Sequence, residues 1–347
     1  MKNLCVTGVP GWLGGRLVEI LRAGYGDERA PAIPALDHLS LLVEPGREAP
    51  QALPKLPKGV RVVRGDVRDP RAVAEAVAGC DTVFHLAAII HPTRRGLTTL
   101  HAVNAEGTRV LVDEAARAGA RRLIHISSNS VGGLSTRLGR PFRETDPPRP
   151  YMGYGRSKAD AEWAVLDATA AGRVDGTILR GCWYYGPNQA DRQTRFFRMV
   201  AQGHPVMFGP GHNLRSLTYV DHLVHAMFAA IDRPKSVGRV YWIADERPYE
   251  TVEIYNAIAD ALGRPHPRPR KLPALVSRAC QLADGALQAA GVYWTEVHVA
   301  GEMAEDIACD VQRAKDELGY APWSTLQEGM ERSVAWCREQ GLDLSPA

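Results

Sequence analysis

The sequence predicts an α/β fold in which a parallel sheet is covered by helices on both faces. Short apolar runs alternate with helical patterns through the first half of the chain. A glycine-rich turn joins the first apolar run to the first helical pattern, and 347 residues suffice for one large domain with a smaller attachment. Repeated strand–helix–strand patterns are typical of parallel sheets, which bind ligands beyond the carboxyl ends of their strands.

The elements are expected in a regular order along the chain. Strands are predicted at residues 4–7, 39–43, 60–64, 82–86 and 122–127, and helices at 12–23, 71–78 and 108–118. Runs 176–180 and 239–244 should return to the sheet, and later helices are predicted at 194–202, 219–231, 252–262 and 327–339. We therefore predict a doubly wound sheet domain of residues 1–181 with 214–246, and a smaller, discontinuous substrate-binding portion of 182–213 and 247–347.

Charge and cysteine usage exclude several classes of function. The net charge of +3 is too small to indicate a nucleic-acid partner. The six cysteines lie far apart, without a CxxC pair or a zinc-ligand spacing, so we predict no metal and a reducing compartment. No signal-peptide pattern is present, and no apolar run approaches the ~18 residues that span a membrane. These features predict a cytoplasmic protein without an integral membrane segment.

A glycine-rich loop follows the first predicted strand. Gly8 permits a tight turn, Gly11 lets the backbone approach a pyrophosphate, and Gly14 lets the helix pack closely on the strand. The first helix then starts at Trp12 and Leu13, where free N–H groups and the helix dipole favour an anion. The spacing is G-x-x-G-x-x-G. Its place between an N-terminal strand and a helix predicts a dinucleotide-binding site in a Rossmann-type fold.

An acidic residue ends the second predicted strand. The Glu44 carboxylate can accept hydrogen bonds from ribose hydroxyls and would repel a 2′-phosphate, so it favours NAD over NADP. Glu44 lies 30 residues after Gly14 (44 − 14), a longer interval than the usual ~20, and Arg47 is near enough in sequence to receive a phosphate instead. NAD is therefore the predicted cofactor and NADP the alternative.

A tyrosine and a lysine are placed four residues apart on one predicted helix, which opens at residue 154 and continues to 166. Tyr154 and Lys158 should share a helix face. A phenol with a pKa of ~10 is a poor base at neutral pH, and a nearby ammonium would lower that pKa. An ordinary surface pair would be the default interpretation of these two residues alone, but the glycine loop favours a catalytic pair.

Serines end the strand predicted at residues 122–127. A hydroxyl from Ser127, Ser128 or Ser130 can donate a hydrogen bond to a substrate oxygen as charge develops on it. A polar strand end that caps a turn would look the same in sequence.

Together these motifs resemble the extended short-chain dehydrogenase/reductase family, also called the NAD-dependent epimerase/dehydratase family. The resemblance covers nearly the whole chain and rests on residues 7–14, 65–69, 84–88, 104–108, 127–128, 154, 158, 185–187 and 219–221. Such an ordered set is specific for the family but not for a substrate. It implies an NAD-binding oxidoreductase or epimerase with a small-molecule substrate, and a homodimer is expected because many relatives pair helices that include the Tyr/Lys helix.

The resemblance also implies roles for individual residues. Asp66 would bind the adenine amino group with Val67 beside the ring, and Asn104 would support the sheet and the cofactor site. Ser128 is the first choice for the catalytic hydroxyl and Ser127 the second, while Tyr154 would be the acid/base and Lys158 its partner. The floor of the cofactor site would be formed by Leu86, Ala87 and Ala88.

Two substrate classes compete. Arg215 matches the arginine that grips the diphosphate in sugar-nucleotide enzymes, and Arg192 and Arg195 could add positive charge. Trp183 occupies the position where those enzymes usually carry Asn. Its large apolar face suits a bulky apolar substrate, and in this the sequence resembles the 3β-hydroxysteroid dehydrogenases. The sequence slightly favours the nucleotide sugar as substrate, because Arg215 matches the arginine of the sugar-nucleotide enzymes.

The net reaction stays open between oxidation, reduction and epimerisation. The Asp-Glu pair that 4,6-dehydratases carry after the catalytic serine is absent from residues 128–133, which argues against dehydration. A non-catalytic NAD(P)-binding sensor is the remaining alternative, although such proteins often lose the tyrosine or the lysine, and both are present here.

Overall fold

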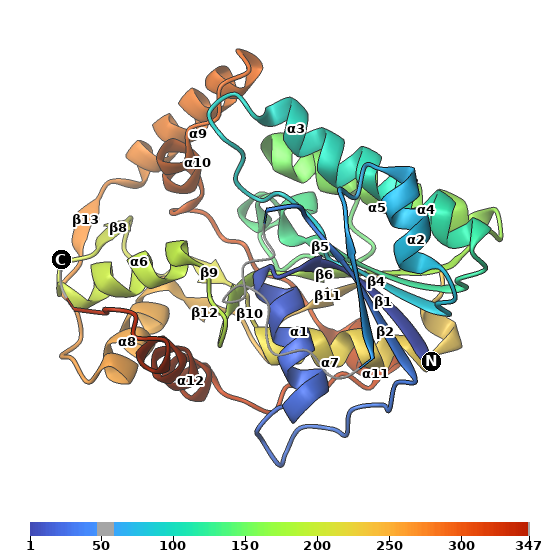
Figure 1. The fold of residues 1–347 in the computed structure, drawn as a ribbon. Coiled ribbons are helices and arrows are strands. Elements are labelled where there is room, and N and C mark those ends of the chain that lie inside the picture. The colour runs from blue at the N-terminus through green and yellow to red at the C-terminus, as the bar shows by residue number, and fades with distance from the viewer. Residues whose placement is uncertain (47–58, 346–347) are drawn as a thin grey trace.

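The computed structural model describes residues 1–46 and 59–345. Within these residues a seven-stranded sheet has the order β11-β6-β5-β4-β1-β2-β3, and every neighbouring pair is parallel (Figure 1). The order reverses between β1 and β4, so the connections that follow these two strands run to opposite faces of the sheet and leave a crevice for a ligand. The predicted doubly wound α/β sheet is confirmed.

The strands of this sheet agree with the predicted runs to within one or two residues. They are β1 (Asn3–Val9), β2 (His38–Val43), β3 (Val60–Arg64), β4 (Thr82–His85), β5 (Arg122–Ser128), β6 (Asp175–Gly181) and β11 (Arg239–Ile243). Both runs expected to return to the sheet do so, because β6 extends β5 and β11 extends β6.

Helices cover both faces of the sheet. One face carries α2 (Pro70–Val77), α4 (Gly107–Arg117) and α5 (Met152–Ala170), with α3 (Leu97–His101) and a π-helical turn (Ala102–Glu106) beside them. The other face carries α1 (Trp12–Ala23), α7 (Val220–Ile231) and α11 (Gln312–Leu318). Each face has its own apolar core, one including Leu17, Val224 and Leu318 and the other Val73 and Leu111.

A second group of elements lies beyond the carboxyl ends of the strands (Figure 1). Its helices are α6 (Asp191–Ala201), α8 (Thr251–Leu262), α9 (Ala274–Ala289), α10 (Thr295–Glu302) and α12 (Leu326–Glu339). Three short ladders join β7 (Trp183–Tyr185) to β10 (Leu217–Tyr219), β9 (Leu214–Arg215) to β12 (Tyr249–Glu250), and β8 (Val206–Phe208) to β13 (Arg270–Leu272). The domain boundaries given from the sequence stay a prediction.

Two helix starts differ from the predicted ones in ways that matter for the site. Helix α6 begins at Asp191 rather than at residue 194, and the Asp191 carboxylate in its first turn suits the positive end of the helix dipole. Helix α5 begins at Met152 rather than at Tyr154. Tyr219, expected in a helix, instead ends β10 and precedes α7.

No helix within the described ranges is long and apolar enough to cross a membrane. The same residues contain no group of three or more His, Cys, Asp or Glu side chains placed to hold a metal ion.

Candidate active site

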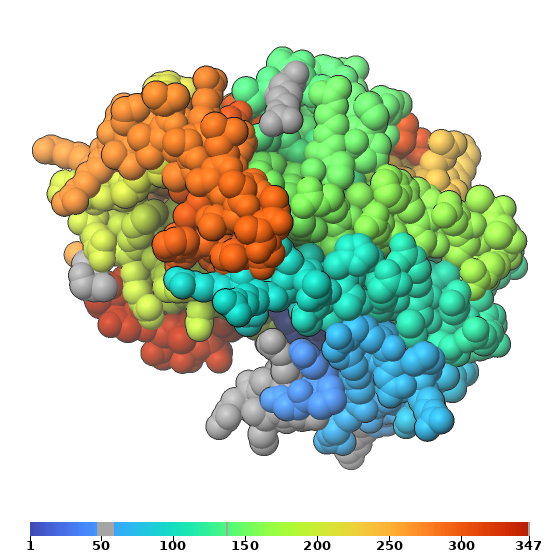
Figure 2. Space-filling model, turned by 90° about the horizontal axis from the view of Figure 1, so that it is seen from above, coloured from blue at the N-terminus to red at the C-terminus, as the bar shows by residue number. Residues whose placement is uncertain are grey.

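A cleft of about 800 Å³ lies at the carboxyl ends of the central strands. Its walls come from the β1–α1 loop, the ends of β2 and β4, and the start of α5. On the outer side, the chain around Tyr293 lies against the segment around Arg94, where the Tyr293 N–H donates to the Arg94 carbonyl at 2.8 Å. Figure 2 shows this contact between the orange and cyan segments. The cleft therefore runs from the glycine loop to the second group of elements.

The glycine loop has the close packing that its spacing predicts. A Cβ on Gly14 would lie 2.5 Å from the Gly8 carbonyl oxygen, and one on Gly8, whose φ is +85°, would lie 2.6 Å from the Ala87 nitrogen. Helix α1 starts directly after Gly11, and no side chain caps its first N–H groups. These groups line the cleft together with Trp12 and Leu13, so an anion can approach them.

Trp12 also ties this loop to the second part of the molecule. Its indole N–H donates to the Pro187 carbonyl at 2.6 Å, and its ring meets Tyr184 edge-on. The start of α1 is thereby held in a fixed position relative to the substrate side of the cleft.

The other predicted cofactor residues also surround the cleft. Glu44, directly after β2, and the pair Asp66 and Val67 line the end that would hold the adenosine. The Asp66 carboxylate accepts from the Arg68 guanidinium at 2.9 and 2.5 Å, which lowers the pKa of Asp66. The floor of the cleft includes Leu86, Ala87 and Ala88. Arg47, the residue that would favour NADP, lies outside the described residues.

Asn104 is buried behind the cleft rather than in its wall. Its side chain accepts from the Ile89 N–H at 2.8 Å, donates to the Ile89 carbonyl at 2.9 Å and donates to Ser157 at 3.0 Å. It therefore fastens the cleft-lining segment after β4 to helix α5, which fits the supporting role that the resemblance implies.

Tyr154 and Lys158 both face the cleft from the first turns of α5. The Lys158 side chain is almost fully buried, and its ammonium donates to the Ile126 carbonyl at 2.7 Å with His125 Nε2 at 3.2 Å. Burial lowers the pKa of Lys158 to about 8, against the opposing charge of Glu162, so the ammonium is still mostly protonated at neutral pH.

The pKa of Tyr154 responds to burial and to two neighbouring side chains. Burial raises it, and the groups that pull it back down are the Ser128 hydroxyl, through a hydrogen bond, and the positive charge of Arg192. The Lys158 ammonium donates to the Ile126 carbonyl, and its effect on the pKa of Tyr154 stays a prediction. Arg192 is thus a further cation whose charge lowers the pKa of the phenol.

The three serines after β5 divide into two groups. Ser127 lines the cleft, but its hydroxyl donates to the buried Glu162 carboxylate at 2.5 Å. Ser128 is the serine that hydrogen-bonds with Tyr154, and the Ser130 hydroxyl donates to Ser128 at 3.0 Å. Ser128 is therefore the serine next to Tyr154, but neither Ser128 nor Ser130 is among the described residues that line the cleft, so the catalytic role of Ser128 stays a prediction.

The residues predicted to bind substrate separate in space. Arg192 lines the cleft, whereas Arg195 is exposed on the same helix. Trp183 packs edge-on against Phe196, and Arg215 donates to the Glu302 carbonyl at 2.5 Å. Neither Trp183 nor Arg215 is among the described side chains that line the cleft, so their contact with substrate stays a prediction.

Several residues of this region were missed in the sequence. His91 and Tyr184 line the cleft, and Tyr293 hydrogen-bonds to His91 at 2.7 Å. Burial, together with the positive charges of Arg192 and His298, lowers the pKa of His91 to about 4, so this ring is neutral at pH 7. No motif marks these residues, since they come from three distant segments.

Helices α9 and α10 hold the start of the catalytic helix. The Gln288 side-chain oxygen accepts from the Gly153 N–H at 2.9 Å, next to Met152, whose φ is +52°. The Gln288 amide donates to Asp284 at 2.9 Å, and Asp284 is 2.7 Å from His298 Nδ1. This buried chain fixes the backbone one residue before Tyr154.

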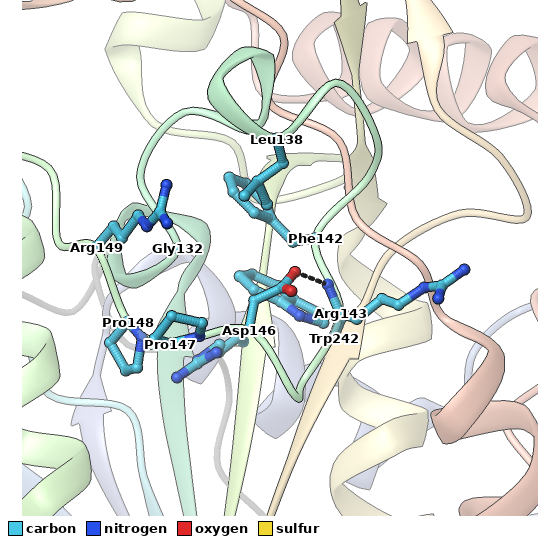
Figure 3. A pocket seen from close by; sticks show the side chains of 10 residues that line it. Gly132, Leu138, Phe142, Arg143, Asp146, Pro147, Pro148, Arg149 and Trp242 are labelled. Carbon is cyan, nitrogen blue, oxygen red and sulfur yellow. Dashed lines mark hydrogen bonds between the residues drawn. The ribbon is translucent and has the colours of Figure 1, made fainter.

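A buried ion pair lies beneath the same helix. Arg180 on β6 donates to the Glu162 carboxylate on α5 at 2.8 and 2.6 Å, and its guanidinium lies 5.0 Å from the centre of the Trp242 ring. Phe142 stacks on the same ring beside a small cavity of about 10 Å³ (Figure 3). This volume holds about one water molecule, so the cavity is packing space rather than a second binding site.

The fold and cleft define a class: a dinucleotide-binding α/β enzyme with a tyrosine, a lysine and a serine at the end of its cofactor cleft. Residues 4–244 match the NAD dependent epimerase/dehydratase family, and the chain belongs to this family. It is accordingly an NAD-dependent enzyme of the extended short-chain dehydrogenase/reductase type, as predicted.

Relatives of this chain fall into more than one branch. It is 38% identical to the uncharacterized protein y4nL of Sinorhizobium fredii, over 97% of this chain and 95% of that protein. It is 27% identical to a 3-beta-hydroxysteroid dehydrogenase of Mycolicibacterium neoaurum, over 97% and 91%. Among solved structures, the dTDP-glucose 4,6-dehydratase DesIV of Streptomyces venezuelae, with NAD and TYD bound, is 25% identical and superimposes with a TM-score of 0.76, over 98% and 97%.

Proposed function

We propose that this protein transfers a hydride between NAD and a carbon that bears a secondary hydroxyl, with Tyr154 as the acid/base. The observation that carries the proposal is the placement of Tyr154 and Lys158 in one wall of the cleft whose other end is the glycine loop. When bound, NAD supplies the nicotinamide that accepts or returns the hydride.

The side chains would share the proton chemistry. The Tyr154 phenolate would take the hydroxyl proton during oxidation, and the phenol would return it during reduction. Ser128, which hydrogen-bonds with Tyr154, would orient the substrate oxygen and stabilise charge on it. Lys158, protonated at neutral pH, would bind the nicotinamide ribose and keep positive charge beneath the site.

For the substrate we propose a nucleotide-diphosphate sugar. The structural similarity to DesIV over nearly the full length of both chains supports this class. Dehydration is not part of the proposal, because residues 128–133 carry no acidic side chain. Among the described residues, the carboxylates that line the cleft are Glu44 and Asp66, both at the adenosine end.

A bulky apolar hydroxy or keto compound is the second candidate. The position of Arg215 favours it, because this side chain donates to the Glu302 carbonyl and is not one of the described side chains that line the cleft. The similarity to a 3-beta-hydroxysteroid dehydrogenase supports the same class.

The test uses the full chain and its Tyr154→Phe variant. NADH formation is followed at 340 nm with UDP- and dTDP-sugars and with 3β-hydroxysteroids, and the sugars are also analysed for epimers. We expect Tyr154→Phe to lower turnover by at least about 100-fold and to leave NAD affinity within about twofold, because NAD binding rests mainly on the glycine loop and the β2 and β4 ends. Unchanged turnover in the variant would refute the assignment of Tyr154.

A further inference from the structure

The end of the cleft near Tyr154 carries a positive charge that no carboxylate of the described residues pairs with. Arg192 lies in the first turn of α6 and lines the cleft. Among the described residues no acidic side chain forms an ion pair with it, and burial lowers the pKa of its guanidinium. A partly buried guanidinium without a counter-charge is costly, and this cost falls when an anion binds.

The neighbours of Arg192 add to this preference. His91 cannot supply a negative charge, and its ring is neutral because its pKa is about 4. The Tyr293 hydroxyl and the His91 ring, 2.7 Å apart, offer neutral polar atoms. The nearby carboxylate of Asp284 is already engaged by His298 at 2.7 Å and by Gln288 at 2.9 Å.

We infer that Arg192 binds a negatively charged group of the substrate, a carboxylate or a phosphate, at the same end of the cleft as the reacting hydroxyl. The inference rests on the proposed function, because it places this anion beside the Tyr154 that would carry the proton. Arg192 and Tyr154 both line the same cleft, together with Tyr184. A guanidinium fork binds either anion through two parallel hydrogen bonds.

This anion site differs from the one that the sequence assigned to Arg215. Arg215 donates to the Glu302 carbonyl, and the pKa of Glu302 is raised mainly by burial, with Arg215 among the charges that oppose the rise. Arg215 thus belongs to a cluster that already contains a carboxylate. Arg192 has no such partner among the described residues and is the cation that a substrate in the cleft would meet.

The experiment uses matched probes that each contain a hydroxyl. NAD-saturated protein is titrated by calorimetry, at constant ionic strength, with 3-hydroxybutyrate and its neutral methyl ester, and with glycerol 3-phosphate and glycerol. We expect one charged probe to bind at least about tenfold more tightly than its neutral counterpart, and the pair that shows this difference identifies a carboxylate or a phosphate.

Variants then assign the preference to a residue. Arg192→Gln should abolish the difference, and Arg192→Lys should restore part of it because the charge returns without the fork. Arg198→Gln is the control, since Arg198 lies on the same helix and donates to the Asp343 carbonyl at 2.6 Å instead of lining the cleft. Equal binding of charged and neutral probes, no binding of any probe, or a preference that survives in Arg192→Gln would overturn the inference.

Failure of the inference can be separated from failure of the proposed function. If the wild-type protein does not bind NAD, or if Tyr154→Phe keeps full turnover, the proposed function is refuted. Normal NAD binding and Tyr154-dependent turnover without an anion preference would refute only the role of Arg192.

Discussion

Removal of Arg180 should strongly destabilise the protein, because it would leave a buried carboxylate without the cation that is hydrogen-bonded to it. Arg180 is 4% exposed and Glu162 2%, and two hydrogen bonds join them at 2.8 and 2.6 Å. In Arg180→Met the Glu162 carboxylate would keep one hydrogen bond, from Ser127. Breaking a buried pair in this way lowers the free energy of unfolding by about 3–5 kcal/mol. This range includes the loss of the contact between Arg180 and the Trp242 ring.

The assay is urea unfolding of the wild type and variants, followed by circular dichroism. Replacement of both partners, Glu162→Leu with Arg180→Met, should recover most of the loss, because neither member of the pair is then left charged without the other. The control is Arg173→Met, whose partner Asp113 is 44% exposed, and it should change the unfolding free energy by less than about 1 kcal/mol. A loss of under about 1 kcal/mol in Arg180→Met, or no recovery in the double variant, would refute the reasoning.

Two further predictions concern the cleft. Gly14→Ala should weaken NAD binding roughly tenfold or more in titration calorimetry, because its Cβ would lie 2.5 Å from the Gly8 carbonyl oxygen; Gly285→Ala, whose nearest neighbour is 3.7 Å away, should bind normally. The pKa of Lys158 is about 8 when folded against ~10.4 unfolded, so the folded state binds fewer protons between these values and unfolding free energy rises with pH there. Relative to Lys158→Met, the wild type should gain up to about 3 kcal/mol between pH 8 and 10.5 in urea unfolding, and an equal pH dependence of both proteins would contradict this.

The sequence predicted those strands and helices that are long enough to show a hydrophobic pattern of their own. The central strands carry apolar runs, so the predicted bounds of β4 (Thr82–His85) and β5 (Arg122–Ser128) each differ from the observed ones by one residue. The short ladders were not predicted, since strands of two or three residues such as β9 (Leu214–Arg215) are too short to show a periodicity. Helix α10 (Thr295–Glu302) was missed for a similar reason, because eight residues give little more than two turns.

The same distinction applies to the site. Tyr154 and Lys158 are four residues apart on one helix, so their common orientation follows from helix geometry. The relation between Arg192 and Tyr154 depends on how α6 meets α5, and no local spacing encodes it. Prediction of α6 from residue 194 also left Arg192 outside the helix, whereas the helix starts at Asp191 and directs Arg192 to the cleft.

The charges along the cleft separate its two ends. Glu44 and Asp66 lie at the adenosine end, where ribose hydroxyls and an amino group can donate to carboxylates. Arg192 lies at the other end, beside Tyr154. A substrate anion would thus be repelled from one end and attracted to the other, and the bound anion would offset the charge with which Arg192 lowers the pKa of Tyr154. Substrate binding should therefore raise the pKa of Tyr154, which favours the phenol as a proton donor and leaves less phenolate to accept the hydroxyl proton.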